Sequence, residues 1–317
     1  MKKFTYLFII YVFALFLIQS CSQKDASVKT IGIIQIVEDT ELDKGREALV
    51  NILKDSGFVD GKNIKINYQN AQGEMSNIPM IINQFKAEDV DLIITITTPC
   101  TIAAAQLVKD IPIVYSIAFN PEQMGSKDYG KNIYGSYDSY NIEEYGSLIK
   151  EILPNKVRVG LPYNPTEANA TFSRNKIKEH LSAAGFEVID MTVNSSNDLL
   201  QVAQTLAQKK VDMFMVGADN IVVLALPSLV KVAEANKIPI FTTEASNIEK
   251  GAAIGFGTDY KLWGEESGKI AIKILKGEKV ESTELAGKKL FINTSAAQKQ
   301  GLVISDSLIQ KADKVIK

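Results

Sequence analysis

Polar side chains gather directly after several apolar runs in this chain of 317 residues. Hydroxyl and amide groups donate and accept hydrogen bonds, and carboxylates accept them from ammonium groups, so such a set suits a small polar ligand. The polar residues that follow the apolar runs include Thr98, Cys100, Thr101, Asn164, Glu167, Asn169, Asp219, Asn220 and Asp259.

The sequence lacks the arrangements that are typical of catalysis. Its one histidine, His180, stands in the middle of a predicted helix, which leaves neither a serine–histidine pair nor a histidine cluster for a metal. No segment has the form GxGxxG or GxxxxGK(S/T) of a phosphate-binding loop. We therefore predict a binding protein rather than an enzyme, with no cofactor and no metal site.

One candidate anchor for a ligand is the segment TTPCT (97–101), which opens a predicted helix. Unpaired backbone N–H groups at the start of a helix attract a carboxylate without help from lysine or arginine. A helix cap with no role in binding explains the same residues equally well. The segment YNPTEAN (163–169) is a second helix start of the same kind, able to hold the carboxylate from the other side.

Carboxylates after the apolar runs favour a positively charged group on the ligand. We expect Asp219 and Asp259 to face an ammonium group, because a buried charge needs an opposite charge. For Glu38 and Glu244, a solvated turn or cap is the better expectation. The three arginines, at 46, 158 and 174, all lie away from these positions, which argues against dianionic ligands such as phosphates and dicarboxylates.

Donors for a carboxylate combined with acceptors for an ammonium group describe an α-amino acid. Apolar walls for an aromatic side chain are expected from Phe119, Tyr163, Phe256 and Tyr260, whereas Trp263 is expected to pack in the core. A neutral sugar or nucleoside remains the alternative ligand, because hydroxyl groups would suit Asn120, Asn164, Asp219 and Asn220.

The apolar runs belong to a repeated pattern that predicts the fold. The segment DVDLIITITTPC (89–100) is matched by KVDMFMVGADN (210–220), and KDIPIVYS (109–116) is matched by NKIPIFTT (236–243). Short apolar runs alternate with amphipathic stretches in both halves, which predicts two β-α-β-α-β-α-β units. We expect an α/β fold of two doubly wound parallel-sheet lobes, with a ligand-binding cleft where the C-terminal ends of the strands meet.

The expected elements have these bounds. Strands are predicted at 31–37, 63–68, 91–97, 111–117, 132–137, 157–161, 186–193, 212–216, 238–242, 252–257 and 288–293, and helices at 42–56, 77–88, 101–108, 168–184, 198–208, 221–235, 262–275 and 305–314. We assign 30–137 with 255–282 to the first lobe and 138–254 with 283–317 to the second, and we expect the crossings between them to form a hinge.

The N-terminus has the features of an export signal. Two lysines precede an apolar run, Phe4–Ile18, which is shorter than the ~20 residues that a spanning helix needs. A serine and then Cys21 follow the run, an order that resembles a bacterial lipoprotein signal. This resemblance implies removal of residues 1–20, a lipid on Cys21 and a tether over 21–29; a plain secretory signal is the alternative.

The overall composition favours a soluble globular protein. Hydrophobic residues make up 46% of the chain and charged residues 23%, as in ordinary folded domains. The net charge of −2, without a basic run, gives no reason to expect a nucleic-acid partner.

Several segments resemble the ABC-transporter substrate-binding proteins of the type I periplasmic binding fold, and most of all the branch with tryptophan-, tyrosine- and phenylalanine-binding members. The resemblance covers roughly Thr30 to the C-terminus and is carried by IGIIQIVE, DGKNIKINYQNAQG, VDLIITITTP, KDIPIVYS, YNPTEAN and GTDYKLWGEESGKIAIKILKGE. Serine is usual in this family at the position of Cys100, and a thiol is a weaker hydrogen-bond donor.

This resemblance implies a lipid-anchored, extracytoplasmic receptor. We expect a monomer that binds a small zwitterionic ligand, with an aromatic amino acid as the first candidate, and passes it to an ABC permease and ATPase. A ligand-sensing lipoprotein that serves a separate receptor is the other role compatible with these residues.

Overall fold

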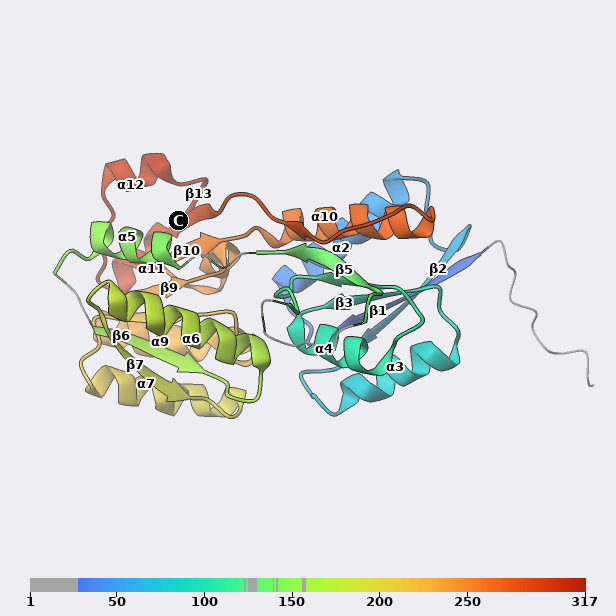
Figure 1. The fold of residues 1–317 in the computed structure, drawn as a ribbon. Coiled ribbons are helices and arrows are strands. Elements are labelled where there is room, and N and C mark those ends of the chain that lie inside the picture. Colours follow the sequence, from blue (N-terminus) through green and yellow to red (C-terminus); the bar gives the residue numbers. More distant parts are fainter. Residues whose placement is uncertain (1–27, 123, 125–129, 139, 141, 156–157) are drawn as a thin grey trace, which may run out of the picture.

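The computed structural model describes residues 28–122, 124, 130–138, 140, 142–155 and 158–317. The predicted signal segment, Cys21 and most of the predicted tether lie outside these residues, so their roles stay predictions. The described residues contain no helix that is both long and apolar enough to cross a bilayer. They form two α/β lobes that lie side by side, each built on one sheet (Figure 1).

The first lobe is built on a six-stranded parallel sheet in the order β11-β5-β4-β3-β1-β2. Its strands are β1 (Lys29–Gln35), β2 (Ile64–Asn70), β3 (Leu92–Ile96), β4 (Ile113–Ser116), β5 (Ile133–Tyr137) and β11 (Thr283–Glu284). The central strands β3 and β4 are buried along their whole length, because helices cover both faces of the sheet.

The helices on this sheet are α2 (Thr40–Asp55), α3 (Asn77–Ala87), α4 (Thr98–Leu107) and α10 (Tyr260–Leu275). Helices α2 and α10 pack together on one face, and α3 and α4 lie together on the other (Figure 1). Helix α10 is therefore a segment from late in the sequence that packs on the first lobe.

The contact between α2 and α10 requires glycine. A Cβ atom at Gly264 of α10 would lie 1.9 Å from the carbonyl oxygen of Gly45 in α2. We expect Gly264→Ala to lower the free energy of unfolding by about 1–3 kcal/mol, the usual cost of overpacking. Urea unfolding measures this change. The matched control is Gly146→Ala, also in a helix, where a Cβ would meet nothing closer than 3.7 Å; an equal loss in both variants would contradict the argument.

The second lobe is built on a seven-stranded sheet in the order β13-β12-β10-β9-β8-β6-β7. Its strands are β6 (Arg158–Tyr163), β7 (Glu187–Thr192), β8 (Met213–Val216), β9 (Ile240–Thr242), β10 (Ile254–Gly257), β12 (Lys289–Asn293) and β13 (Lys314–Ile316). The sheet departs from the expected parallel pattern at one edge, where β12 runs antiparallel to β10. The reason is connectivity, because β12 enters this lobe directly from β11 of the first lobe.

The helices of the second lobe are α5 (Glu143–Ile152), α6 (Ala168–Ala183), α7 (Leu199–Gln208), α8 (Asn220–Leu224), α9 (Leu226–Asn236), α11 (Thr294–Lys299) and α12 (Asp306–Lys311), with 3₁₀ helices η2 (Ser196–Asp198) and η3 (Ala245–Lys250). Helix α5 was not expected. The helix predicted at 221–235 is divided into α8 and α9, because Pro227 at the start of α9 has no N–H to continue the first helix. The helix predicted at 305–314 is shorter, because Lys314–Ile316 pairs with β12 instead.

The chain passes between the lobes after β5, after β10 and after β11. Strand β10 pairs with β9 and β12 of the second sheet, and β11 pairs with β5 of the first. The second and third crossings thus fall slightly later in the chain than the expected boundaries after residues 254 and 282. The pairing of β10 and β11 with their neighbouring strands decides these positions, and the sequence pattern alone does not show this pairing.

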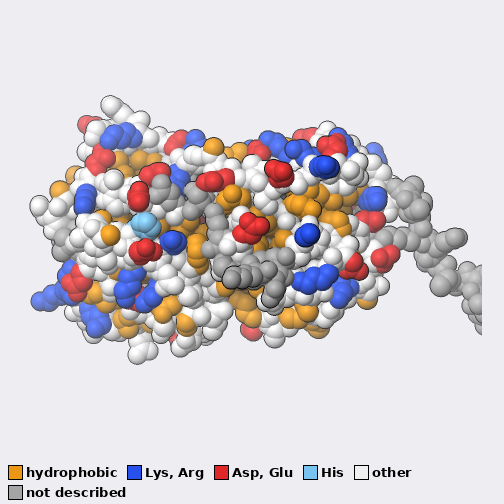
Figure 2. Space-filling model, viewed as in Figure 1, with side chains coloured by type: hydrophobic (Ala, Val, Ile, Leu, Met, Phe, Trp, Pro, Cys, Tyr) orange, Lys and Arg blue, Asp and Glu red, His pale blue; other side chains and the backbone are white. Residues whose placement is uncertain are grey.

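The duplicated segments of the sequence form β3 and β8, each in the interior of its sheet. Their C-terminal ends carry Thr97 and Thr98 in the first lobe and Asp219 and Asn220 in the second. Acidic and basic side chains are interspersed over both lobes on the face shown in Figure 2.

Candidate ligand-binding site

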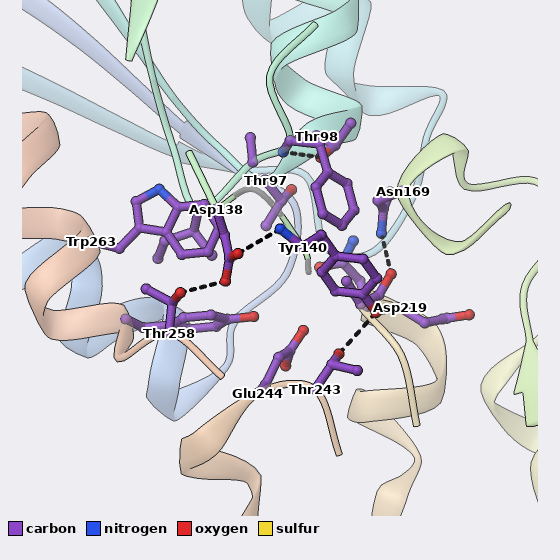
Figure 3. A pocket seen from close by; sticks show the side chains of 16 residues that line it. Thr97, Thr98, Asp138, Tyr140, Asn169, Asp219, Thr243, Glu244, Thr258 and Trp263 are labelled. Atoms are coloured by element: carbon purple, nitrogen blue, oxygen red, sulfur yellow. Dashed lines mark hydrogen bonds between the residues drawn. The ribbon is translucent and has the colours of Figure 1, made fainter. Parts of the chain in front are cut away.

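A pocket with about 510 Å³ of empty space lies between the two lobes. Both sheets contribute the loops after their strands, and α10 contributes two rings (Figure 3). The lining residues are Thr97, Thr98, Ile117, Ala118, Phe119, Asp138, Tyr140, Asn169, Ala218, Asp219, Asn220, Thr243, Glu244, Thr258, Tyr260 and Trp263.

Three of the lining residues have a positive φ angle, a backbone conformation that residues other than glycine rarely adopt. The φ angles are 81° at Thr97, 51° at Ile117 and 53° at Tyr140. Two of the three are β-branched, for which a positive φ is a marked strain. Strain of this kind persists where ligand contacts demand it, so its concentration here supports the pocket as the functional site.

Hydrogen bonds hold the first-lobe wall in this strained form. The Thr97 N–H donates to the Ser116 carbonyl at 3.1 Å, and the Phe119 N–H donates to the Thr98 hydroxyl at 3.1 Å. These bonds tie the loop after β3 to the loop after β4. The start of α4, with Pro99 in its first turn, is thereby fixed at the pocket.

Two of the residues predicted at the start of α4 do not reach the pocket. Cys100 is fully buried in the core, and burial raises the pKa of its thiol to about 12, so the thiol stays neutral. The Thr101 hydroxyl donates to the Thr97 carbonyl at 3.0 Å and lies 2.9 Å from the Thr95 hydroxyl. The prediction that these two side chains contact a ligand is therefore wrong: both lie on the side of the helix that packs on the sheet.

Asp219 lies in the second-lobe wall, where the sequence predicted it. It caps α8 by accepting from the Val222 N–H at 2.9 Å, and its other oxygen accepts from the Asn164 N–H at 2.6 Å. Burial, and then the negative charge of Glu167, raise the pKa of Asp219 to about 7. A carboxylate held this way is poised to ionise when a positive charge enters the pocket.

Three residues of the segment 163–169 lie behind this wall instead of lining the pocket. The Glu167 carboxylate accepts from the Asn220 side chain and from the Ile221 N–H at 3.2 Å. The backbone of Asn164 binds Asp219, and the Tyr163 ring lies 5.3 Å from the Arg174 guanidinium. These residues position the wall, so their predicted direct contact with a ligand is corrected.

Asn169 of the same segment does reach the pocket. Its Nδ2 donates to Glu167 and to the Ala218 carbonyl, both at 3.0 Å, which settles the orientation of the amide. Its Oδ1 is buried and has no hydrogen-bond partner among the described residues. Asn169 therefore brings a buried amide oxygen with no partner among the described residues to the wall of the pocket.

Of the two predicted ligand contacts Phe119 and Asp259, Phe119 lines the pocket and Asp259 does not. The Phe119 ring, from the first lobe, lies 4.9 Å from Phe172 and 5.0 Å from Tyr140, which places an aromatic cluster across the cleft. Asp259 is the N-cap of α10 and accepts from the Lys261 N–H at 2.8 Å. Asp259 was predicted as a ligand contact because the family that the sequence resembles has an acidic residue at this position. In the structure its side chain instead caps α10.

Two carboxylates of the pocket were missed or misjudged from the sequence. Asp138 follows β5 and accepts from the Tyr140 N–H at 2.6 Å and from the Thr258 hydroxyl. Glu244, expected to be a solvated turn residue, lines the pocket, and burial raises its pKa to about 7. The rule that ligands bind after strand ends would have found Asp138 had it been applied to β5.

Trp263 packs in the core of the first lobe, as expected, and its ring also borders the pocket. Its indole Nε1 donates to the Ser136 carbonyl at 2.7 Å, which fixes the ring at the edge of the pocket. The carboxylates of Asp138 and Glu244 lie on two sides of the space between Trp263 and Tyr140 (Figure 3). No clear sequence signal separates this ring from a core residue.

The charged side chains that line the pocket are acidic. Three carboxylates line it, and no lysine, arginine or histidine does so among the residues that the structure describes. The described residues also contain no cluster of side chains suited to a metal ion. Carboxylate acceptors, the start of α4 and flanking rings together can bind a ligand that carries an ammonium group, a carboxylate and an aromatic ring.

Comparisons with known proteins agree with this geometry. The chain is 33% identical to a tyrosine-binding protein of Clostridioides difficile, over 88% of this chain and 86% of the relative. It superposes with a TM-score of 0.84 on a Streptococcus pneumonia ABC domain in complex with L-Trp, at 27% identity and covering 92% of this chain and 100% of that one. The TM-score is 0.67 for a ligand-free, open substrate-binding protein with adhesive properties from Clostridium difficile, at 32% identity and covering 91% and 99%.

The lobes have the architecture of type I periplasmic binding proteins, as the sequence predicted. The family model of ABC transporter substrate binding proteins matches residues 30–316. The chain therefore belongs to the ABC transporter substrate-binding protein family.

Proposed function

We propose that this protein is an extracytoplasmic receptor for an aromatic amino acid and that it delivers the ligand to an ABC permease and ATPase. The observation that carries the proposal is the pocket itself, in which carboxylates face the start of a helix and no described cation lines the wall. The names of the similar proteins, which bind tyrosine or L-Trp, support the same class of ligand.

In the proposed complex, each end of the ligand meets a different lobe. The ammonium group pairs with Asp219 and Glu244, whose raised pKa values reflect burial of negative charge. The ligand carboxylate accepts from the N–H groups of Thr98 and Cys100 at the start of α4, because Pro99 has no N–H and the N–H groups of Thr97 and Thr101 are bonded to carbonyl groups. The aromatic side chain lies among the rings that line the pocket, namely Phe119, Tyr140, Tyr260 and Trp263.

Thermal unfolding with candidate ligands tests the function. The protein from Ser22 to Lys317 is heated with each standard amino acid, several sugars and several nucleosides. A ligand present at a hundred times its dissociation constant adds about 2.7 kcal/mol to the free energy of unfolding. We expect stabilisation by aromatic amino acids, and stabilisation by a sugar or nucleoside alone would overturn the proposed ligand class.

A neutral ligand is the second candidate, because the pocket also contains uncharged hydrogen-bonding groups. These are Thr98, Asn169, Asn220, Thr243 and Thr258. Hydroxyl groups of a sugar would suit them, but burial of Asp219 beside a neutral ligand would leave its carboxylate without an opposite charge. The same unfolding screen distinguishes the two ligand classes.

The proposed lipid anchor leads to a separate prediction. We expect Cys21→Ala to move the protein from the membrane fraction to the soluble fraction of the cell envelope, because no other residue would receive the lipid. Fractionation followed by mass spectrometry of the N-terminal peptide measures this. Ligand binding by the variant should be unchanged, and a membrane-bound variant would refute anchoring through Cys21.

A further inference from the structure

A set of ion pairs joins the two lobes beside the pocket. The Asp39 carboxylate, after β1 of the first lobe, binds the Lys250 ammonium group in η3 of the second. The Lys44 Nζ of α2 lies 2.9 Å from Glu249 Oε2, also in η3. We call these residues the interlobe network: Asp39, Lys44, Glu249 and Lys250.

Three members of this network are held in place by their own lobe. The second oxygen of Asp39 caps α2 by accepting from the Glu41 N–H at 3.0 Å, and Glu41 also binds Lys44 at 2.7 Å. On the opposite side, Lys314 and Lys44 together lower the pKa of Glu249 to about 2. The partners are therefore pre-organised, which reduces the entropy lost when the lobes meet.

The Asp39–Lys250 pair is shielded from solvent. Its side chains are only 10% and 18% exposed, respectively, whereas most ion pairs among the described residues include at least one exposed side chain, as in Lys29–Asp91, Lys261–Glu265 and Lys311–Glu151. Water and salt screen a shielded pair less than an exposed one, so this pair contributes more to holding the lobes together.

Glu244 connects the network to the pocket. It directly precedes η3 and lines the main pocket, and with Asp39 it also lines a smaller neighbouring pocket between the lobes. The positive charge of Lys250 and a hydrogen bond from Tyr260 stabilise its ionised form. The same short helix thus carries a proposed ligand contact at its start and ion-pair partners at its end.

This structure resembles the L-Trp complex more than it resembles the open, ligand-free protein. The chain superposes better on the L-Trp complex, with a TM-score of 0.84, than on the open, ligand-free protein, with 0.67. Sequence identity has the opposite order, 27% against 32%, so sequence divergence does not account for the difference in TM-score. The ion pairs of the network join the two lobes, so they would have to break for the lobes to move apart.

We propose that the interlobe network is a clamp that sets how long the closed pocket retains its ligand. Its residues do not touch the ligand and act by positioning the lobes. This inference rests on the proposed function, because it attributes part of the protein's affinity for the ligand to residues outside the main pocket.

The test uses two variants that keep the local structure. Lys250→Gln removes one charge, and Asp39→Asn removes the other while asparagine still caps α2. We expect each variant to release an aromatic amino acid on the order of tenfold faster, with little change in association rate, since affinity changes within one interface lie mostly in dissociation. The double variant should resemble either single one, because the pair is already broken. Stopped-flow fluorescence measures both rates.

The matched control is Lys289→Gln, which removes an ion pair within the second lobe. Lys289 lies 2.8 Å from Asp313, on the exposed surface. The Lys289→Gln variant should release the ligand at the same rate as the unaltered protein. If the unaltered protein binds ligand and all variants release it at the same rate, the clamp is refuted and the proposed function stands.

If no tested amino acid binds, the proposed function fails, and small-angle scattering of the unliganded proteins tests the clamp directly. We then expect a larger radius of gyration for Lys250→Gln than for the unaltered protein and for Lys289→Gln. Equal radii would overturn the clamp.

Discussion

Asp219→Asn is expected to weaken binding of an aromatic amino acid by about 30-fold to several thousand-fold, because truncating a buried charge pair costs about 2–5 kcal/mol. The variant removes the negative charge from the second-lobe wall and leaves the ligand ammonium group without this partner. Isothermal titration calorimetry measures the dissociation constants. The change also disturbs the pocket itself, since Asp219 accepts from the N–H groups of Val222 and Asn164.

A deaminated ligand separates these two effects. Removing the ammonium group from the ligand should weaken binding strongly in the unaltered protein and only slightly in Asp219→Asn, because the charge pair is already absent. The melting temperature of the unliganded variant reports any structural loss. If both ligands lose affinity equally in the variant, Asp219 acts through the structure of the wall alone, and our assignment of the ammonium site is wrong.

Ligand affinity is expected to rise steeply between pH 5 and pH 8. Burial, as the main cause, raises the pKa values of Asp219 and Glu244 to about 7, and both must ionise to pair with an ammonium group. Below pH 7, each carboxylate that must lose a proton lowers the apparent affinity by about tenfold per pH unit. Calorimetry at several pH values, in buffers of different ionisation enthalpy, measures both the affinity and the protons released.

The stability of the unliganded protein should change in the opposite direction. Ordinary carboxyl pKa values are 3.8 for Asp and 4.5 for Glu, so between these values and about 7 the folded protein retains protons that the unfolded chain has released. The free energy of unfolding therefore falls as pH rises through this window. Glu244→Gln should reduce both pH dependences, and an affinity that is flat from pH 5 to pH 8 would refute the proposed ion pairs.

The parts of the site that the sequence predicted are those that follow from local pattern. Thr98, Asp219 and Asn220 come directly after β3 and β8, and parallel strands place their C-terminal ends along one edge of a sheet. The repeat of these two segments identified both lobes and the cleft between them. Cys100 and Thr101 were misplaced because the end of a strand locates the start of the next helix but does not say which residues of that helix face the pocket. Successive residues of a helix point in different directions.

The sequence by itself determined the α/β class, the two lobes and the acidic character of the cleft, because hydrophobic periodicity and residue charge are local properties of the chain. Only the tertiary structure decided that Asp138, Glu244 and Trp263 line the pocket and that Asp259 caps a helix. It also decided that Asp39 meets Lys250 across the cleft. These contacts depend on how two separate lobes close on each other, and residues some two hundred positions apart meet only when both sheets and the crossings between them are in place.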